Sequence, residues 1–430
     1  MKIMRILNIL IFAISFITLL SCDLEGGESL NGASTSSISD DLSRGELPQA
    51  MAGILSDMRV DLNTQIDVQS VFGREYYYLT GSDPRWEGDV VTGVLDDNTF
   101  YTTRPWGARY AAIKDINLTL TGLENTTADF STAEIAGIRG VLNTLKAHEL
   151  LMVANNQGEN GIRIDVSDPD NLGAFVSFDG ALTAIADLLS SASSDLATAG
   201  STFPFDLTDG YEVPFSQFNK ALAARVEAYR GNYPAVLSLL GDSFMNMSGD
   251  LKTGVYHTFS LSGADLANPL FGALNQTAIV RVSHSSFVDD ALAGDTRVNK
   301  VVLRDAPTEA SGLVGTHDVW IYQTNVDNVP IIRNEELILL YAEANMTASP
   351  TDAVDAINIV RNASGLGNYS GATTADALED EILFQRRYSL FGESHRWVDM
   401  RRFDRLGELP NDRTTDNVPL AVPIPANENQ

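Results

Sequence analysis

Cysteine is almost absent from this 430-residue chain: Cys22 is the only one, so no disulfide bond can form within it. The fold must therefore be held together by packing alone. Once the first 21 residues are set aside, about 410 residues remain, which is ample for a large hydrophobic core.

Catalytic and cofactor motifs are missing as well. His148 is followed by Glu149, but Met152 stands where the helical zinc pattern needs a second histidine. Neither a phosphate-binding G-x-x-x-x-G-K loop nor a G-x-S-x-G elbow occurs. We therefore predict that the protein is not an enzyme and has no catalytic residues, no metal site and no cofactor.

Positive charge is scarce, since 29 Lys and Arg stand against 57 Asp and Glu and give a formal net charge of -28. Binding of nucleic acid depends on Lys and Arg that neutralise phosphates, so nucleic acid is excluded as a partner. An acidic surface of this kind repels itself unless salt screens it. We therefore expect a saline habitat for the source of this sequence and a fold that salt stabilises.

The N-terminus has the pattern of a lipoprotein signal. Lys2 and Arg5 precede an apolar run of 15 residues, Ile6 to Leu20, which is shorter than the roughly 20 residues that span a bilayer as a helix. Ser21 and Cys22 follow directly. We predict that residues 1–21 are a cleaved signal peptide and that Cys22 is lipidated. The alternative is a buried structural cysteine after an uncleaved signal.

Residues 22–39 are rich in Gly, Ser, Thr and acids, which is typical of a flexible tether. The folded body is expected over residues 40–430. Apolar residues at helical spacing predict a mainly α scaffold of paired helices at about 40–63, 108–243 and 331–406. Two segments, about 64–107 and 244–330, break this pattern with aromatic residues, turns and short β-like runs, and there we expect the ligand face.

The helical pairs have a recurring small-and-aromatic pattern. Ala221, Ala224 and Ala228 precede Tyr229 and Gly231, as in a tetratricopeptide hairpin, in which small residues admit the next helix and glycine makes the turn. Helix pairs that cannot bury their faces alone must stack. The alternative is an ordinary irregular helical domain.

The C-terminal part carries the most specific motif. Residues 382–403 read ILFQRRYSLFGESHRWVDMRRF and resemble the C-terminal signature of SusD/RagB-like proteins, E-R-x-x-E-L-x-x-E-G-x-R-W-x-D-L-R-R. Residues 333–344, 353–361 and 422–425 resemble other stretches of the same family. Glutamine and two serines stand where the family prefers Glu or Gly. The resemblance implies a SusD-like fold with a tetratricopeptide-like scaffold and irregular, short-stranded insertions.

The same motif is dense in arginines and acids. Arg386, Arg396 and Arg402 stand close to Glu393 and Asp399, and guanidinium planes match carboxylates well. We predict a structural, charge-paired seam around the tryptophan of the motif. The alternative is a cluster that binds an anionic ligand.

The resemblance implies a function as well. It implies a lipid-anchored protein on the outer membrane, facing the cell exterior, that captures oligosaccharides and delivers them to a SusC-like TonB-dependent transporter. A RagB-like lipoprotein that binds oligopeptides is the main alternative. A glycoside hydrolase and a structural adhesin are weaker alternatives.

Aromatic residues in the irregular segments are the candidate sugar platforms, because the apolar face of a pyranose stacks on an exposed ring while polar side chains bind its hydroxyls. Trp86 ranks first, since turn residues surround it and Val90 is the one aliphatic residue within four positions, so an exposed loop is expected. The alternative for each tryptophan is core packing. In order of preference the candidates are Trp86 with its neighbours Arg85, Asp83 and Tyr78, then Trp106 and Tyr101, then Trp320.

Overall fold

The computed structural model describes residues 35–429 apart from 202, 208 and 264. The predicted signal peptide, Cys22 and residues 22–34 of the predicted tether lie outside the described residues. The tether prediction is wrong for its last residues, because α2 (Thr35–Asp40) is a helix that packs against the end of α5. The two backbones approach so closely that a Cβ at Gly122 would lie 1.7 Å from the Ile38 carbonyl oxygen.

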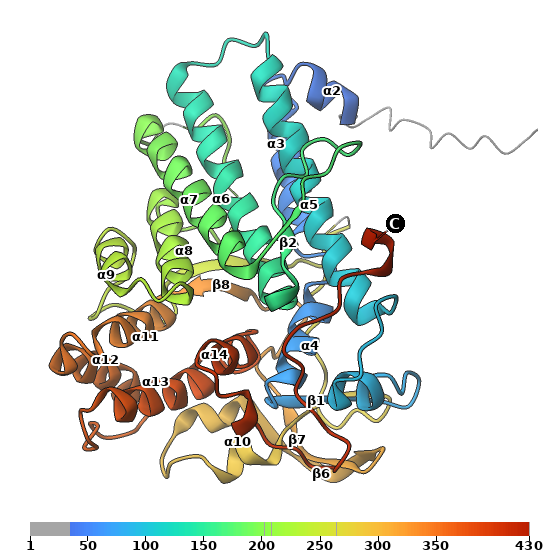
Figure 1. Ribbon diagram of the computed structural model, residues 1–430, viewed down its shortest axis with the longest axis vertical. Coiled ribbons are helices and arrows are strands. Elements are labelled where there is room, and N and C mark those ends of the chain that lie inside the picture. The colour runs from blue at the N-terminus through green and yellow to red at the C-terminus, as the bar shows by residue number, and fades with distance from the viewer. Residues whose placement is uncertain (1–34, 202, 208, 264, 430) are drawn as a thin grey trace, which may run out of the picture.

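Long antiparallel helices build the upper half of the molecule (Figure 1). One of the two longest, α6, begins with a capping box in which the Ser131 side chain accepts from Glu134 N and the Glu134 carboxylate accepts from Ser131 N. Their apolar stripes form the main core. The helices are α3 (Leu47–Asp57), α5 (Phe100–Asn125), α6 (Thr132–Gln157), α7 (Phe178–Ala199), α8 (Phe215–Tyr229) and α9 (Tyr233–Gly241). Helix α4 (Leu62–Phe72) lies below them in Figure 1, and its apolar residues belong to other clusters.

A second group of helices lies in the lower half and has its own apolar cluster (Figure 1). It comprises α11 (Asn334–Asn345), α12 (Pro350–Ala363), α13 (Ala375–Ser389) and α14 (Arg396–Arg402), with the short α10 (Ser285–Asp289) nearby. The α8–α9 turn contains Gly231 at a φ of +69°, a left-handed conformation that favours glycine. Together the two groups confirm the prediction of a mainly α fold built on helix pairs.

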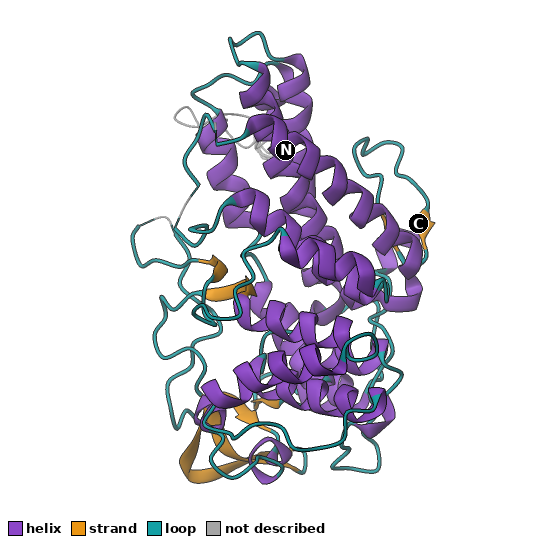
Figure 2. Ribbon diagram, turned by 90° about the vertical axis from the view of Figure 1, so that its left-hand side faces the viewer, coloured by secondary structure: helices purple, strands orange, loops and turns teal. Residues whose placement is uncertain are grey.

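Strands occupy a small part of the molecule, at its lower edge, at the junction of the two halves and, as one short piece, beside the C-terminus (Figure 2). One antiparallel sheet has the order β1-β5-β7-β6, formed by β1 (Tyr76–Thr80), β5 (Ile279–Ser283), β7 (Leu313–Val319) and β6 (Val301–Ala310). Two strand pairs complete the set: β2 (Ile162–Arg163) with β3 (Phe175–Val176), and β4 (Gly254–His257) with β8 (Val329–Arg333).

The four-stranded sheet joins the two segments that the sequence predicted to be irregular. Strand β1 comes from 64–107 and pairs with β5 from 244–330, so that Tyr76 opposes Ser283 and Thr80 opposes Ile279. The first segment is more regular than predicted, since α4 runs to Phe72, a π-helical turn spans Trp86–Val90, and α5 begins at Phe100. Short 3-10 helices lie at Gly158–Asn160, Thr296–Lys300, Leu406–Glu408 and Ala426–Asn429.

The arginine-rich motif is structural, as predicted. Arg386 Nε lies 2.7 Å from Asp399 Oδ2 and Arg402 Nε lies 3.0 Å from Asp399 Oδ1. Arg386 and Asp399 are buried, and Arg402 is partly buried. Burial alone would raise the pKa of Asp399, but the charges of Arg386 and Arg402 lower it to about 2. Trp397 is fully buried beside them and packs on Phe72 with ring centres 5.0 Å apart.

A buried histidine lies between two helices of the second group, α11 and α14. His395 precedes α14 and lies 3.8 Å from Glu336 of α11. Burial lowers the pKa of His395 to about 4, although the Glu336 charge acts in the opposite direction. The ring therefore stays neutral in the folded protein near neutral pH. No helix among the described residues is both long and apolar enough to cross a bilayer.

Candidate functional site

A groove with a volume of about 270 Å³ opens where the two irregular segments meet. Its walls come from the start of α4, from β1, from the loop 269–276 and from the ends of β5 and β7. The lining residues are Asn63, Tyr78, Pro269, Leu270, Phe271, Gly272, Ala273, Gln276, Ile279, Val280, Arg281, Asp318 and Val319.

Arg281 connects the walls of this groove. It stands directly opposite Tyr78 across the β1–β5 pair, and its guanidinium carbon lies 5.1 Å from the centre of the Tyr78 ring. Asp67 of α4 holds it with two bonds, 2.6 Å to Nε and 2.7 Å to Nη2. Burial would lower the pKa of Arg281, but the Asp67 charge raises it above its ordinary value, so the ion pair is intact.

Arg281 also fixes the loop 269–276 to the sheet, because it donates to the carbonyl oxygens of Leu270 and Pro269 at 3.2 Å each. Asp318 is equally fixed. It accepts from Asn275 N at 2.6 Å and pairs with Arg304. The charged groups of the groove are therefore satisfied within the protein and serve to hold its shape.

Aromatic rings line the groove from two sides. Tyr78 forms one wall and is backed by Trp86, with ring centres 4.4 Å apart. Phe271 stands in the loop that forms another wall, and the half-buried Trp320 lies beside it at 6.3 Å. Rings in this arrangement offer apolar faces on which a flat apolar surface of a ligand can stack.

Two polar groups in the groove keep free hydrogen-bonding capacity. Among the described residues, neither the Tyr78 hydroxyl nor the Asn63 side-chain amide has a hydrogen-bond partner. Burial raises the pKa of Tyr78, so its hydroxyl keeps its proton and can donate. The Gln276 amide has no such free capacity, because it accepts a hydrogen bond from Ala273 N and donates one to Ile279 O, at 3.0 Å each. The groove can thus bind a ligand through stacking and a few hydrogen bonds.

The prediction that Trp86 lies on an exposed loop is wrong. It begins the π-helical turn, is only 7% exposed, and packs between Tyr78 and Phe100, whose ring centres lie 4.4 and 5.0 Å away. Its partners come from β1 and α5, which lie beyond the four-residue window that the sequence argument used. Trp86 supports the groove from behind and does not line it.

Arg85 and Asp83, the two candidate residues close to Trp86 in the sequence, lie at the surface. Arg85 and Asp83 bind each other with two hydrogen bonds of 2.7 Å, and the Arg85 guanidinium covers the Phe100 ring at 4.8 Å. Tyr101 is fully buried, donates to Asp89 at 2.9 Å and accepts from Asp96 N at 2.8 Å. These contacts are structural, and none of the three residues lines the groove.

Trp106 lies in a different part of the molecule. It is 6% exposed, and its Nε1 donates to Glu428 at 3.1 Å. Of the predicted residues, Tyr78 lines the groove with Trp86 packed behind it, and Trp320 lies next to the lining residue Phe271, whereas Trp106 and Tyr101 lie apart from the groove. The sequence argument missed Asn63, Phe271 and Arg281. Arg281 stands between Val280 and Val282 in one of the short β-like runs expected within 244–330, and this position was the one available indication.

Comparisons with known proteins agree on the fold. Residues 294–421 match the model of the SusD family. SusD-like protein P38 of Formosa agariphila is 34% identical over 91 residues, an alignment that spans only 19% of this chain and 18% of that relative.

Two solved structures are similar over most of their length. Surface glycan-binding protein A from Bacteroides thetaiotaomicron, solved in complex with laminarihexaose, aligns with a TM-score of 0.69 and 15% identity over 90% of this chain and 97% of its own. A SusD superfamily protein from Bacteroides vulgatus aligns with a TM-score of 0.66 and 16% identity, over 90% of this chain and 96% of its own length. Residues 294–421 therefore match the SusD family, and the chain shares the fold of the solved SusD superfamily structures. The resemblance of the C-terminal motif to SusD/RagB-like proteins is confirmed.

Proposed function

We propose that this protein is a non-catalytic binding protein that captures an oligosaccharide in the groove beside Tyr78 and Trp320. The observation that supports it most is the groove itself, which combines aromatic walls with the free Tyr78 hydroxyl and Asn63 amide. The proposed ligand face draws on both predicted segments, 64–107 and 244–330, because residues of each line this groove.

The chemistry of a sugar suits this site. A pyranose presents an apolar C–H face, which stacks on the Tyr78 ring, and hydroxyls, which reach Asn63 and the Tyr78 hydroxyl. A groove of about 270 Å³ encloses only part of a chain ligand, so the rest of an oligosaccharide extends outward past Phe271 and Trp320. The laminarihexaose complex of the B. thetaiotaomicron protein makes a β-glucan the first ligand to test.

The cellular setting in the proposal rests on the N-terminal sequence and on the family resemblance. Acylation of Cys22 would hold the protein on the outer membrane, facing outward, since more than one acyl chain is needed for stable anchoring. From there it would pass its ligand to a SusC-like TonB-dependent transporter. Co-purification of a large barrel protein with the tagged chain from its native membrane tests this part separately.

Calorimetric titration tests the binding proposal. The full chain carrying Cys22→Ala, which blocks acylation, is titrated with laminarin oligosaccharides, with other neutral and acidic glycans, and with a peptide digest. Tyr78→Ala removes the stacking wall and is expected to weaken glycan binding about tenfold or more, which corresponds to about 1.4 kcal/mol. Tyr78→Phe and Asn63→Ala each remove one hydrogen bond and are expected to weaken binding about fivefold.

Tyr369→Ala is the matched control, because Tyr369 is a similarly exposed tyrosine in a loop after α12, outside the groove. It should leave the affinity unchanged. Binding of peptides alone would favour the RagB-like alternative. Glycan binding that Tyr78→Ala leaves intact would show that the groove is not the binding site.

A further inference from the structure

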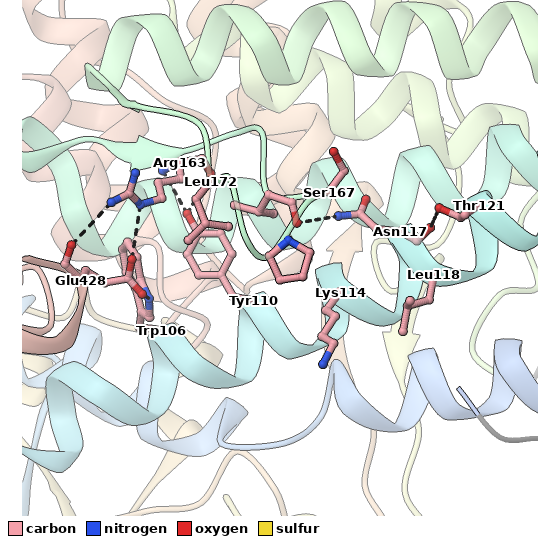
Figure 3. A pocket seen from close by; sticks show the side chains of 12 residues that line it. Trp106, Tyr110, Lys114, Asn117, Leu118, Thr121, Arg163, Ser167, Leu172 and Glu428 are labelled. Atoms are coloured by element: carbon pink, nitrogen blue, oxygen red, sulfur yellow. Dashed lines mark hydrogen bonds and ion pairs between the residues drawn. The ribbon is translucent and has the colours of Figure 1, made fainter. Parts of the chain in front are cut away.

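A second pocket lies along helix α5, away from the groove (Figure 3). It has a volume of about 220 Å³ and lies between α5 and the loop that connects β2 with β3. Trp106, Tyr110, Lys114 and Leu118 line it at intervals of four residues, so they form one stripe on the helix. With a rise of 1.5 Å per residue, this stripe is about 18 Å long. The pocket is therefore elongated.

Apolar groups dominate its open surface. Leu118 comes from the helix, and Val166, Pro169 and Leu172 come from the facing loop. Leu172 is 43% exposed, which is unusual for a leucine that could pack inward. The rings of Trp106 and Tyr110 close one end, with their centres 4.7 Å apart.

The polar groups at this closed end are already engaged. The Tyr110 hydroxyl donates to Arg163 O at 2.8 Å and accepts from Arg163 N at 3.1 Å. The Arg163 guanidinium binds Glu428 at 3.3 Å and Gly173 O at 2.5 Å, and Glu428 also accepts from Trp106 Nε1. These bonds, drawn in part in Figure 3, leave little capacity for a ligand's hydroxyl groups.

The polar groups at the other end are engaged as well. Asn117 accepts from Lys146 Nζ at 2.8 Å and donates to Val166 O at 3.5 Å. The Thr121 hydroxyl donates to Asn117 O at 3.0 Å, and the Ser167 hydroxyl donates to Asp165 at 3.0 Å. A saccharide, which needs a hydrogen bond for nearly every hydroxyl, would not be satisfied in this pocket.

Lys114 is the exception. Its side chain lines the middle of the pocket, is exposed, and has no hydrogen-bond or ion-pair partner among the described residues. In a chain with a net charge of -28, an unpaired ammonium group next to an apolar wall is unusual. A flexible four-carbon stem lets that group reach an anion at either end of the pocket.

We propose that the α5 pocket binds a small monocarboxylate with an unbranched hydrocarbon body, whose chain lies along the stripe from Tyr110 to Leu118 and whose carboxylate pairs with Lys114. The elongated apolar shape selects the hydrocarbon chain, and the single free cation selects the one negative charge. This site is distinct from the groove and does not depend on the proposed glycan binding.

Titration with decanoate, followed by methyl NMR of the full chain with Cys22→Ala, tests the proposal. Decanoate should shift the methyl signals of Val166, Leu118 and Leu172 in a saturable way. Lys114→Gln should weaken decanoate binding about fivefold, as expected for an exposed ion pair, and leave the binding of 1-decanol unchanged. Lys252→Gln removes an exposed lysine elsewhere and is the matched control.

Leu172→Ser removes apolar contact at the rim and should weaken decanoate and 1-decanol alike, about tenfold. A laminarin oligosaccharide should not compete with decanoate. The proposal is overturned if decanoate causes no saturable shift at these methyl groups, if Lys114→Gln leaves its affinity unchanged, or if the oligosaccharide displaces it.

Discussion

Replacement of Trp86 by alanine is expected to destabilise the fold as well as to weaken binding. Trp86 is 7% exposed and contacts the rings of Tyr78 and Phe100 at 4.4 and 5.0 Å. It belongs to the apolar cluster that also contains Trp397 and the sheet residue Val282. Its removal leaves a cavity among groups that come from three different elements.

The size of the effect follows from that burial. Replacement of a buried Phe or Trp by Ala costs about 3–5 kcal/mol, which is a large share of the roughly 5–15 kcal/mol that stabilises a typical domain. Trp320→Ala is the matched comparison, because Trp320 is only half-buried, and we expect a loss of about 1–2 kcal/mol there. Glycan binding should weaken in both variants, since Tyr78 loses its support in the first and Phe271 loses its neighbour in the second.

Urea unfolding followed by far-UV circular dichroism measures the difference without using tryptophan emission. We expect the midpoint of Trp86→Ala to fall clearly below that of Trp320→Ala, with little change in slope. A loss of less than about 1 kcal/mol in Trp86→Ala would refute the reasoning, because it would show that this ring lies in solvent, as the sequence alone suggested.

Three further predictions concern charge. The pKa of His395 is about 4 in the folded protein and 6.5 ordinarily, so its contribution to the unfolding free energy is complete above pH 6.5 and is lost as the pH falls toward 4. His395→Asn should therefore reduce the slope of the unfolding free energy against pH over that range by about 1.4 kcal/mol per pH unit. Equal slopes in the variant and the original protein would contradict this. Asp399→Asn removes the carboxylate partner of the buried Arg386 and one of the two carboxylate partners of Arg402. It should cost about 3–5 kcal/mol in urea unfolding, whereas a loss below about 1 kcal/mol would mean that the seam contributes little. The net charge of -28 should make the melting temperature rise between about 0.1 and 1 M NaCl, as the screening length shortens from about 10 to 3 Å; an unchanged melting temperature would remove the support for a salt-adapted surface.

The helical fold could be predicted because the sequence features that indicate it lie within short stretches of the chain. Apolar spacing marks the helix pairs, the motif at 382–403 carries the family resemblance, and Arg386 with Asp399 lies within one short stretch of sequence. The prediction failed at the start of the body, where α2 forms at Thr35–Asp40 in a segment of tether-like composition. That helix is held by its close contact with α5, which the composition of the segment does not reveal.

The candidate groove could be predicted only in part, because it is assembled from distant segments. Asp67 and Arg281, which hold it together, are 214 positions apart. Tyr78 and Trp320 were named as candidates from their aromatic character, yet Trp86 was ranked above them because its ring partners lie outside its local window. Burial of a single aromatic residue depends on tertiary contacts that a window of neighbours does not contain.

A crystal structure of the protein with a bound laminarin oligosaccharide tests the central claim most directly. The account predicts that a sugar ring lies against Tyr78, that Asn63 bonds one of its hydroxyls, and that the chain continues past Phe271 toward Trp320. A saccharide found elsewhere on the molecule, with the groove between α4, β1 and the loop 269–276 empty, would contradict it.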